Sequence, residues 1–218
     1  LKAICVVSAN DCVMAIAEHI AGSEEMFVEQ MNNKAKELGM NDTHFENCHG
    51  IDEDGHVSSS YDISLMSKEL LTKHPTITNY TTIWMDTLRD GQSQLTNTNK
   101  LVRTYDGCTG LKTGSTSLAL YNLSASATRD DLSLIAVVMK GPTSEIRFSD
   151  AKKLLDYGFS NYSYTKLTTA NDFVQTADVQ KGTSNTVNLL YESDSGALVK
   201  NNESAEIKTE TTLNENIT

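Results

Sequence analysis

The most constraining feature of the sequence is a change of hydrophobic periodicity near residue 110. Before this point, apolar residues recur every three or four positions, which is typical of helices that bury one face. After it, apolar and polar residues alternate from Tyr121 to Thr128, and an apolar run from Leu132 to Met139 follows. The alternation predicts a strand with one buried face, and the apolar run predicts a second strand that is largely buried. We therefore expect an α/β protein of the mixed α+β type, built on an antiparallel hairpin.

Four helices are predicted from this spacing and from the residues that flank it. The segments and their expected caps are residues 11–21 after Asn10, 24–38 after Ser23, 60–74 after the serines at 58–60, and 145–158 after Ser144. In the last helix, we expect Ile146, Ala151, Leu154 and Leu155 to face inward.

The remaining segments predict loops and a small β region. Residues 40–57 and 76–106 are polar and rich in turn-forming residues. From about Tyr164 onward, short β-like pieces alternate with Gly, Asn and Ser turns, and the tail over 201–218 is polar and acidic. We thus expect two domains, residues 1–163 and residues 164–218.

Charge argues against two classes of partner. The chain has 18 basic and 29 acidic residues, a net charge of -11. This balance works against binding nucleic acid or an anionic membrane through a broad basic surface. No apolar run reaches the roughly 18 residues expected of a membrane helix. Small molecules, peptides and glycans remain possible substrates.

Cysteine and histidine spacing does not indicate a metal site. The four cysteines form no Cys-x-x-Cys pair, and three disulfide pairings are conceivable. We favour free, mostly buried thiols, because a domain of this size does not need disulfide bonds to be stable. The loop histidines are expected to be solvated, so we predict no metal and no cofactor. The residues concerned are Cys5, Cys12, Cys48 and Cys108, and His44, His49 and His56.

Lys112-Thr113-Gly114 is the first candidate for chemistry. Its lysine would be a fixed positive charge at an exposed strand edge, and the glycine removes a side chain that would block a ligand lying there. The hydroxyls of Thr113, Ser115 and Thr116 are suited to binding a carboxylate. The alternative is an ordinary turn that leads into a strand.

Ser8-Ala9-Asn10 is the second candidate. It supplies a hydroxyl and a side-chain amide two residues apart at a helix start, which suits proton relay and the binding of a substrate amide. The alternative is simple capping of the helix.

Together and in this order, the two motifs resemble those of the low-molecular-weight penicillin-binding proteins of the D-alanyl-D-alanine carboxypeptidase type. These serine peptidases trim the stem peptide of bacterial cell-wall peptidoglycan. The resemblance covers about residues 1–165 and includes the blocks 24–32, 38–45, 47–50, 97–101 and 110–116. It implies a β-lactamase/transpeptidase-like domain with an antiparallel sheet and helices, incomplete at the N-terminus, followed by a small C-terminal β domain.

The resemblance also implies a mechanism. A serine of a Ser-x-x-Lys motif attacks the carbonyl between two D-alanines and forms an acyl-enzyme that water releases. Ser8 would act in proton relay, Asn10 would contact the substrate backbone, and Lys112 would tune the electrostatics of the site. The residues implied in substrate binding are Thr113, Gly114, Thr116 and Arg147.

Arg147 has two interpretations. A guanidinium is the best-shaped partner for a carboxylate, and the family places an arginine at this distance after Lys-Thr-Gly. The alternative is an exposed arginine on the surface of a helix.

The sequence departs from the family pattern at its start. In the family, Ser-x-x-Lys precedes Ser-x-Asn, whereas here Ser8 lies almost at the first residue and the chain lacks an initiator methionine. We expect an N-terminal segment with the missing motif to lie upstream of Leu1. Two Ser-x-x-Lys strings follow Lys-Thr-Gly instead, at Ser149–Lys152 and Ser163–Lys166, and neither is expected to be catalytic.

Two other functions stay open. A serine β-lactamase would hydrolyse penicillin, although Ser8-Ala9-Asn10 lacks the Ser-Asp-Asn pattern of class A enzymes. A catalytically silent module would bind peptidoglycan stems or β-lactams without forming an acyl-enzyme.

The family resemblance implies partners and a location as well. The partners are the stem peptide ending in D-Ala-D-Ala and β-lactam inhibitors, with no nucleic acid and with membrane contact only through segments outside this chain. The location is extracytoplasmic, in the cell envelope.

Overall fold

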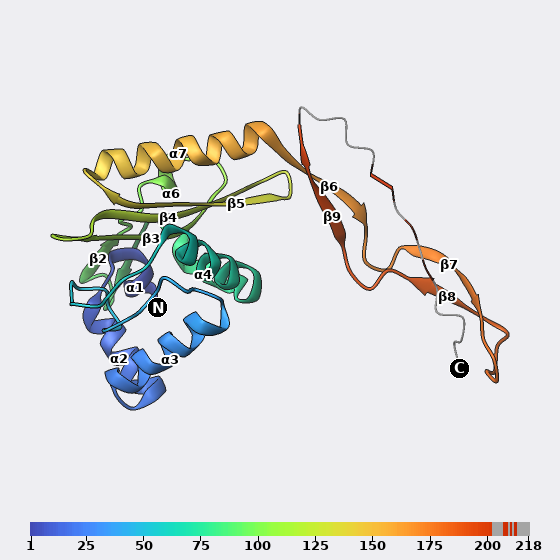
Figure 1. Cartoon of the computed structure of the whole chain (residues 1–218), viewed down its shortest axis with the longest axis horizontal. Helices are drawn as coiled ribbons and strands as arrows, with labels where there is room; N and C mark the ends of the chain where they lie inside the picture. The colour runs from blue at the N-terminus through green and yellow to red at the C-terminus, as the bar shows by residue number, and fades with distance from the viewer. Residues whose placement is uncertain (202–206, 209, 211, 213–218) are drawn as a thin grey trace. The chain divides into compact units, whose positions relative to one another are not determined.

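The computed structural model describes residues 1–201, 207, 208, 210 and 212 (Figure 1). Most of the tail predicted over 201–218 therefore lies outside the described residues. Two compact units are found: residues 1–129 with 133–158, and residues 130–132 with those from Phe159 onward. Helices and antiparallel strand pairs make up these units, which confirms the mixed α+β prediction.

Local caps determine the helices of the first unit. Ser23 accepts a hydrogen bond from the Met26 amide at 3.2 Å, and Ser59 accepts one from the Asp62 amide at 3.2 Å, so two predicted starts are confirmed. The helices are α1 (Lys2–Val7), α2 (Asn10–Ala21), α3 (Glu24–Glu37), α4 (Ser60–Lys73), η1 (Pro75–Ile77), α5 (Thr78–Thr81), α6 (Leu101–Thr104) and α7 (Ser144–Asn161).

The predicted capping role of Asn10 is wrong. Asn10 is the first helical residue of α2, and Ala9 occupies the N-cap position without a side-chain hydrogen bond. The start of this helix is instead set by Ser8, whose left-handed backbone ends α1 and turns the chain into α2.

A short hairpin interrupts the segment predicted as a loop over 76–106. It consists of β1 (Met85–Leu88) and β2 (Ser93–Thr96), joined by a turn at Asp90-Gly91 as expected. Sequence periodicity missed it because the strands are short and mostly exposed, and only Leu95 is buried.

The main sheet has the order β3-β4-β5, formed by β3 (Cys108–Thr116), β4 (Leu120–Arg129) and β5 (Leu132–Gly141). Both burial predictions for this hairpin are wrong. β4, predicted to have one buried face, has five consecutive buried residues, and β5, predicted to be largely buried, has only three. The reason is position, since β4 lies between two neighbours and β5 is at the edge of the described sheet.

Helices cover both faces of this sheet, with α7 along one side and α4 on the other (Figure 1). Ser67 of α4 and Ser124 of β4 share a buried hydrogen bond of 2.7 Å. Gly158 does not end α7 as predicted, and the helix continues to Asn161. Gly158 is buried, and a Cβ at this position would lie 2.4 Å from Leu134 Cδ1.

Two details of α7 differ from the prediction. The Ile146 amide donates to Thr143 Oγ1 at 3.3 Å, so Thr143 and not Ser144 caps the helix. Ile146 and Leu154 are exposed, while Arg147, Phe148, Ala151 and Leu155 are buried. The face of α7 that meets the sheet therefore includes an arginine that the apolar pattern could not place.

The second unit contains two antiparallel strand pairs. One pair is β6 (Tyr162–Thr168) with β9 (Ser195–Lys200), and the other is β7 (Phe173–Asp178) with β8 (Thr186–Leu190). This confirms the β-rich character expected for the C-terminal region. Throughout the described residues, every helix is too short or too polar to cross a membrane.

Candidate active site

A cleft of about 490 Å³ in the first unit brings the predicted site residues together. Its walls come from the α1–α2 junction, strand β3, the first turn of α7 and the loop over 48–51. The residues that line it are Ile4, Ser8, Asn10, Val13, Cys48, His49, Gly50, Ile51, Thr98, Lys112, Thr113, Gly114, Ser115, Thr116 and Arg147. All seven site residues named by the sequence motifs are among them.

Ser8 and Asn10 present unused polar groups to the cleft. Both residues are exposed, and within the described part of the chain neither side chain has a hydrogen-bond partner. Ser8 has φ 60° and ψ 45°, a left-handed conformation that is uncommon for a residue with a Cβ. Such strain is found at functional sites, where it fixes the direction of a side chain.

Lys112 lies in a partly buried position on β3. Its Nζ donates to the Thr113 carbonyl at 2.7 Å. Burial lowers the pKa of Lys112 to about 8, with the Cys5 thiol acting to raise it and the Arg147 charge acting to lower it. The expectation of an exposed lysine is therefore wrong, whereas a pKa of about 8 leaves the amine mostly protonated at pH 7.

Thr98 is a cleft residue that motif reasoning did not assign. Thr113 Oγ1 donates to Thr98 Oγ1 at 2.7 Å, and the Thr98 amide donates to the Val6 carbonyl at 3.0 Å. Buried Asn97 and Asn99 hold this turn, since Asn97 Oδ1 accepts from the Asn99 amide at 2.8 Å. The block 97–101 noted in the sequence was the available signal. Thr98 thus connects β3 to the end of α1.

Arg147 is buried, with 7% of its surface exposed, so the interpretation as a surface arginine is wrong. Its Nη1 donates to the Gly114 carbonyl at 3.0 Å and to the Asn122 carbonyl at 3.1 Å. The guanidinium carbon lies 5.4 Å from the ring centroid of Tyr121. Burial lowers the pKa of Arg147, but the guanidinium stays charged. Its Nε is buried without a partner among the described residues.

The opposite wall is a loop held by side chains from its surroundings. Glu24 Oε1 accepts from the Cys48 amide at 3.1 Å. Asn47 Oδ1 accepts from the Gly50 amide at 2.7 Å, and its Nδ2 donates to the Ile51 carbonyl at 2.9 Å. These bonds leave few free backbone groups in the turn. The loop is therefore a fixed wall.

The remaining candidates do not contribute to the cleft. Ser149 and Lys152 lie on α7, Ser163 lies on β6, and Lys166 pairs with Asp194 at 2.7 Å. None of them lines the cavity.

The four thiols are free, and the prediction that they are mostly buried is wrong, because only Cys5 is buried. Cys48 lines the cleft, and its pKa is raised to about 11, first by burial and then by Glu24. No cluster of metal-ligating side chains occurs among the described residues.

The arrangement is suited to an extended ligand with a terminal carboxylate. Lys112 and Arg147 place positive charge beside β3 in a chain of net charge -11. The adjacent hydroxyls of Ser115 and Thr116 and the open backbone at Gly114 allow a peptide to lie along this strand. Charged donors of this kind bind carboxylates more strongly than neutral donors do.

Comparisons with known proteins agree with this geometry. Residues 1–143 match the family model of D-alanyl-D-alanine carboxypeptidase, and residues 162–218 match that of the penicillin-binding protein 5 C-terminal domain. The chain is 41% identical to the D-alanyl-D-alanine carboxypeptidase DacF of Bacillus subtilis over all of its own length and 57% of the relative's. It is 38% identical to DacC of Escherichia coli over 72% of this chain and 39% of that one. The chain thus spans about half the length of the curated relatives that it matches.

Solved structures show the same fold. Penicillin-binding protein 5 of Haemophilus influenzae matches with a TM-score of 0.77 and 33% identity, covering 93% of this chain and 59% of that one. Penicillin-binding protein D2 of Listeria monocytogenes, solved in its cefotaxime-bound form, matches with a TM-score of 0.68 and 36% identity over 72% and 64% of the two chains. The transpeptidase-like fold is confirmed, and the chain belongs to the D-alanyl-D-alanine carboxypeptidase family of serine peptidases, family S11.

Proposed function

We propose that the protein acts as a serine-type D-alanyl-D-alanine carboxypeptidase, which removes the terminal D-alanine of peptidoglycan stem peptides through an acyl-enzyme. One observation carries the proposal. The Ser-x-Asn and Lys-Thr-Gly motifs and Arg147, far apart in the sequence, line a single cleft, and the chain belongs to a family with this activity.

The catalytic roles follow from the chemistry of each group. Ser8 relays a proton through its hydroxyl, and Asn10 holds a substrate amide with its side-chain amide. Lys112, with a pKa of about 8, can exchange a proton with Ser8 at neutral pH and stabilise negative charge when protonated. The attacking serine belongs to a Ser-x-x-Lys motif other than the strings at Ser149 and Ser163, neither of which is among the residues that line the cleft.

The substrate-binding roles concern the terminal carboxylate. Thr113 and Thr116 offer hydroxyls along β3, and Arg147 supplies the charge beside them. Gly114 leaves room for the substrate backbone to approach the strand. The substrate would thus lie along β3 with its carboxylate toward Lys112 and Arg147.

The proposal extends to partners, location and domain limits. Its partners are stem peptides ending in D-Ala-D-Ala and β-lactams, and its place is the extracytoplasmic cell envelope. Residues 1–163 would form the catalytic part and residues 164–218 a separate β-rich part. The relative solved with cefotaxime supports the assignment of β-lactams as ligands.

The test uses the complete gene product. It is incubated with fluorescent penicillin and resolved on a denaturing gel, and D-alanine release is measured from a peptide ending in D-Ala-D-Ala. Covalent labelling with D-alanine release supports the proposal. Rapid penicillin turnover without D-alanine release would favour a β-lactamase, and reversible binding without label would favour a silent module.

Variants and a stereochemical control sharpen this test. Lys112→Ala should reduce labelling, whereas Lys68→Ala, an exposed lysine of α4 outside the cleft, should not. A peptide ending in L-Ala-L-Ala should release no alanine. The 218-residue chain alone should stay unlabelled, and a label at Ser149 or Ser163 would contradict the assignment of the nucleophile.

A further inference from the structure

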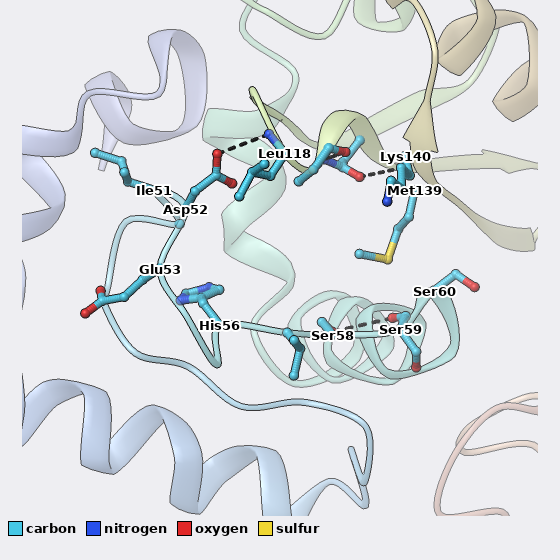
Figure 2. Close-up of a pocket in the computed structure, with 14 residues that line it drawn as sticks. Ile51, Asp52, Glu53, His56, Ser58, Ser59, Ser60, Leu118, Met139 and Lys140 are labelled. Carbon is cyan, nitrogen blue, oxygen red and sulfur yellow. Dashed lines mark hydrogen bonds between the residues drawn. The ribbon is translucent and has the colours of Figure 1, made fainter.

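Asp52 joins the two walls of the cleft just beyond the residues that line it. On the loop side, Ile51 lines the cleft and Asp52 follows it, and on the β3 side, Thr116 lines the cleft and Ser117 follows it. Asp52 Oδ2 accepts from Ser117 Oγ and from the Leu118 amide, both at 3.2 Å. The bond to Leu118 is drawn in Figure 2, where Asp52 faces the turn after β3.

The same contact reaches a residue with a proposed role in substrate binding. The pKa of Asp52 is lowered, mainly by hydrogen bonding from the Thr116 hydroxyl, with further contributions from the Leu118 amide and the Ser117 hydroxyl. Thr116 Oγ1 also accepts from the Ala119 amide at 2.9 Å. Thr116 Oγ1 is therefore fixed to the same turn that Asp52 binds through Ser117 and Leu118.

The neighbouring acidic residues do not share this connection. Glu53 Oε2 accepts from Asn47 Nδ2 at 3.0 Å within the loop itself. Asp54 is exposed and has no polar contact among the described residues. Within that part of the chain, Asp52 is the loop residue whose side chain bonds to the turn after β3.

The loop and the strand are each fixed at their other ends. Glu24 and Asn47 hold the loop from Cys48 to Ile51, and Arg147 holds β3 at Gly114. Neither set of bonds determines the separation between Ile51 and Thr116. The Asp52 contacts do, because they cross from one wall to the other.

We propose that Asp52 is a positioning residue that sets the width of the cleft at Ile51 and Thr116 by holding the turn after β3 against the loop. The inference rests on the proposed carboxypeptidase function of the same cleft. Asp52 touches no reacting atom, and it acts through the turn at Ser117 and Leu118. Its loss therefore weakens substrate binding, while the chemical step at the nucleophile is less affected.

The test measures single-turnover acylation of the complete gene product by fluorescent penicillin at several concentrations. This separates the dissociation constant of the first, non-covalent complex from the acylation rate constant. For Asp52→Ala we expect the dissociation constant to rise about tenfold, since small misplacements of binding groups have effects of this size or larger. The acylation rate constant should change less than about threefold, and Ser117→Ala, which removes one of the two bonds, should give an intermediate rise.

Asp54→Ala is the matched control, with the same loss of charge two residues further along the loop, and it should behave as wild type. A merely structural role of Asp52 would lower the fraction of protein that is labelled and leave both constants unchanged, and that result overturns the inference. An equal effect of Asp54→Ala would do the same. If wild type itself is not labelled, the proposed function fails and the inference with it, whereas labelled wild type with an unchanged Asp52→Ala variant contradicts the inference alone.

Discussion

Arg147 of α7 donates a hydrogen bond to the carbonyl oxygen of Gly114 at 3.0 Å, which joins the helix to the strand that carries Lys-Thr-Gly. A second bond from the same Nη1 reaches the Asn122 carbonyl on β4. The guanidinium thus has a structural role in holding the sheet and a position in the cleft. Substitution of Arg147 should therefore lower both stability and ligand binding, but to different degrees.

Arg147→Ala should destabilise the chain and weaken binding of ligands with a carboxylate. Two partly buried carbonyl groups lose a charged donor, which costs about 2–4 kcal/mol. Arg147→Lys should recover part of the stability but little of the binding, because an ammonium lacks the planar fork that fits a carboxylate. Urea denaturation gives the free energy of unfolding, and penicillin labelling of the complete gene product gives the binding. Full recovery of binding in Arg147→Lys would show that charge alone is sufficient.

Replacing Lys112 should stabilise the protein while it removes function. The folded-state pKa of about 8 lies below the ordinary value of 10.5, so the folded state disfavours the charged form. Below pH 8 this cost is fully present, and it is at most about 3 kcal/mol for a shift of this size. Between pH 8 and 10.5 the unfolded state binds more protons, so the stability of wild type should rise with pH.

Lys112→Met keeps the length of the side chain and has no charge to desolvate. It should therefore exceed wild type in free energy of unfolding at pH 7, and the difference should shrink as the pH is raised through 8 toward 10.5. Urea denaturation across this range checks the sign. A difference independent of pH would mean that packing, and not desolvation of the ammonium, accounts for it.

Some of these features were predictable from the sequence and others were not. Caps such as Ser23 and Ser59 act on amides three residues away, so α3 and α4 were predicted nearly to the residue. The alternation in β4 identified a strand for a similarly local reason, but its prediction of one buried face was wrong, because helices cover both faces of the sheet (Figure 1). The burial of β5 was predicted wrongly because it depends on which strand has two neighbours, and that is a property of the sheet.

The candidate site also has features that were predictable from the sequence and features that were not. The motifs named residues of β3 and of the α1–α2 junction, and these residues line one cleft. The environment of Lys112 was predicted wrongly, and Thr98 was not assigned, because both depend on how α1 approaches β3. A tertiary approach of this kind leaves no periodicity in the sequence.

Glu24 should control the order of the loop wall. Glu24 Oε1 accepts from the Cys48 amide, so Glu24→Ala should increase hydrogen exchange of that amide and of Gly50. Glu25→Ala is the matched control, because Glu25 lies in the same first turn of α3 and has the same favourable interaction with the helix N-terminus. Equal exchange in the two variants would assign the effect to the helix and not to the loop contact.

Two substitutions of Ser8 separate the effect of its left-handed backbone on stability from the role of its hydroxyl in labelling by penicillin. Ser8→Ala keeps the left-handed backbone and removes the hydroxyl, so it should change the free energy of unfolding by less than about 0.5 kcal/mol, as is usual at exposed positions, while penicillin labelling falls sharply. Ser8→Gly removes the hydroxyl and also relieves the positive φ, so it should be more stable than Ser8→Ala by about 0.5–1 kcal/mol. Urea denaturation of the chain and labelling of the complete gene product measure the two effects independently. If Ser8→Gly and Ser8→Ala unfold at the same urea concentration, the left-handed conformation stores no strain. If either variant labels like wild type, the proposed role of the Ser8 hydroxyl in proton relay is wrong.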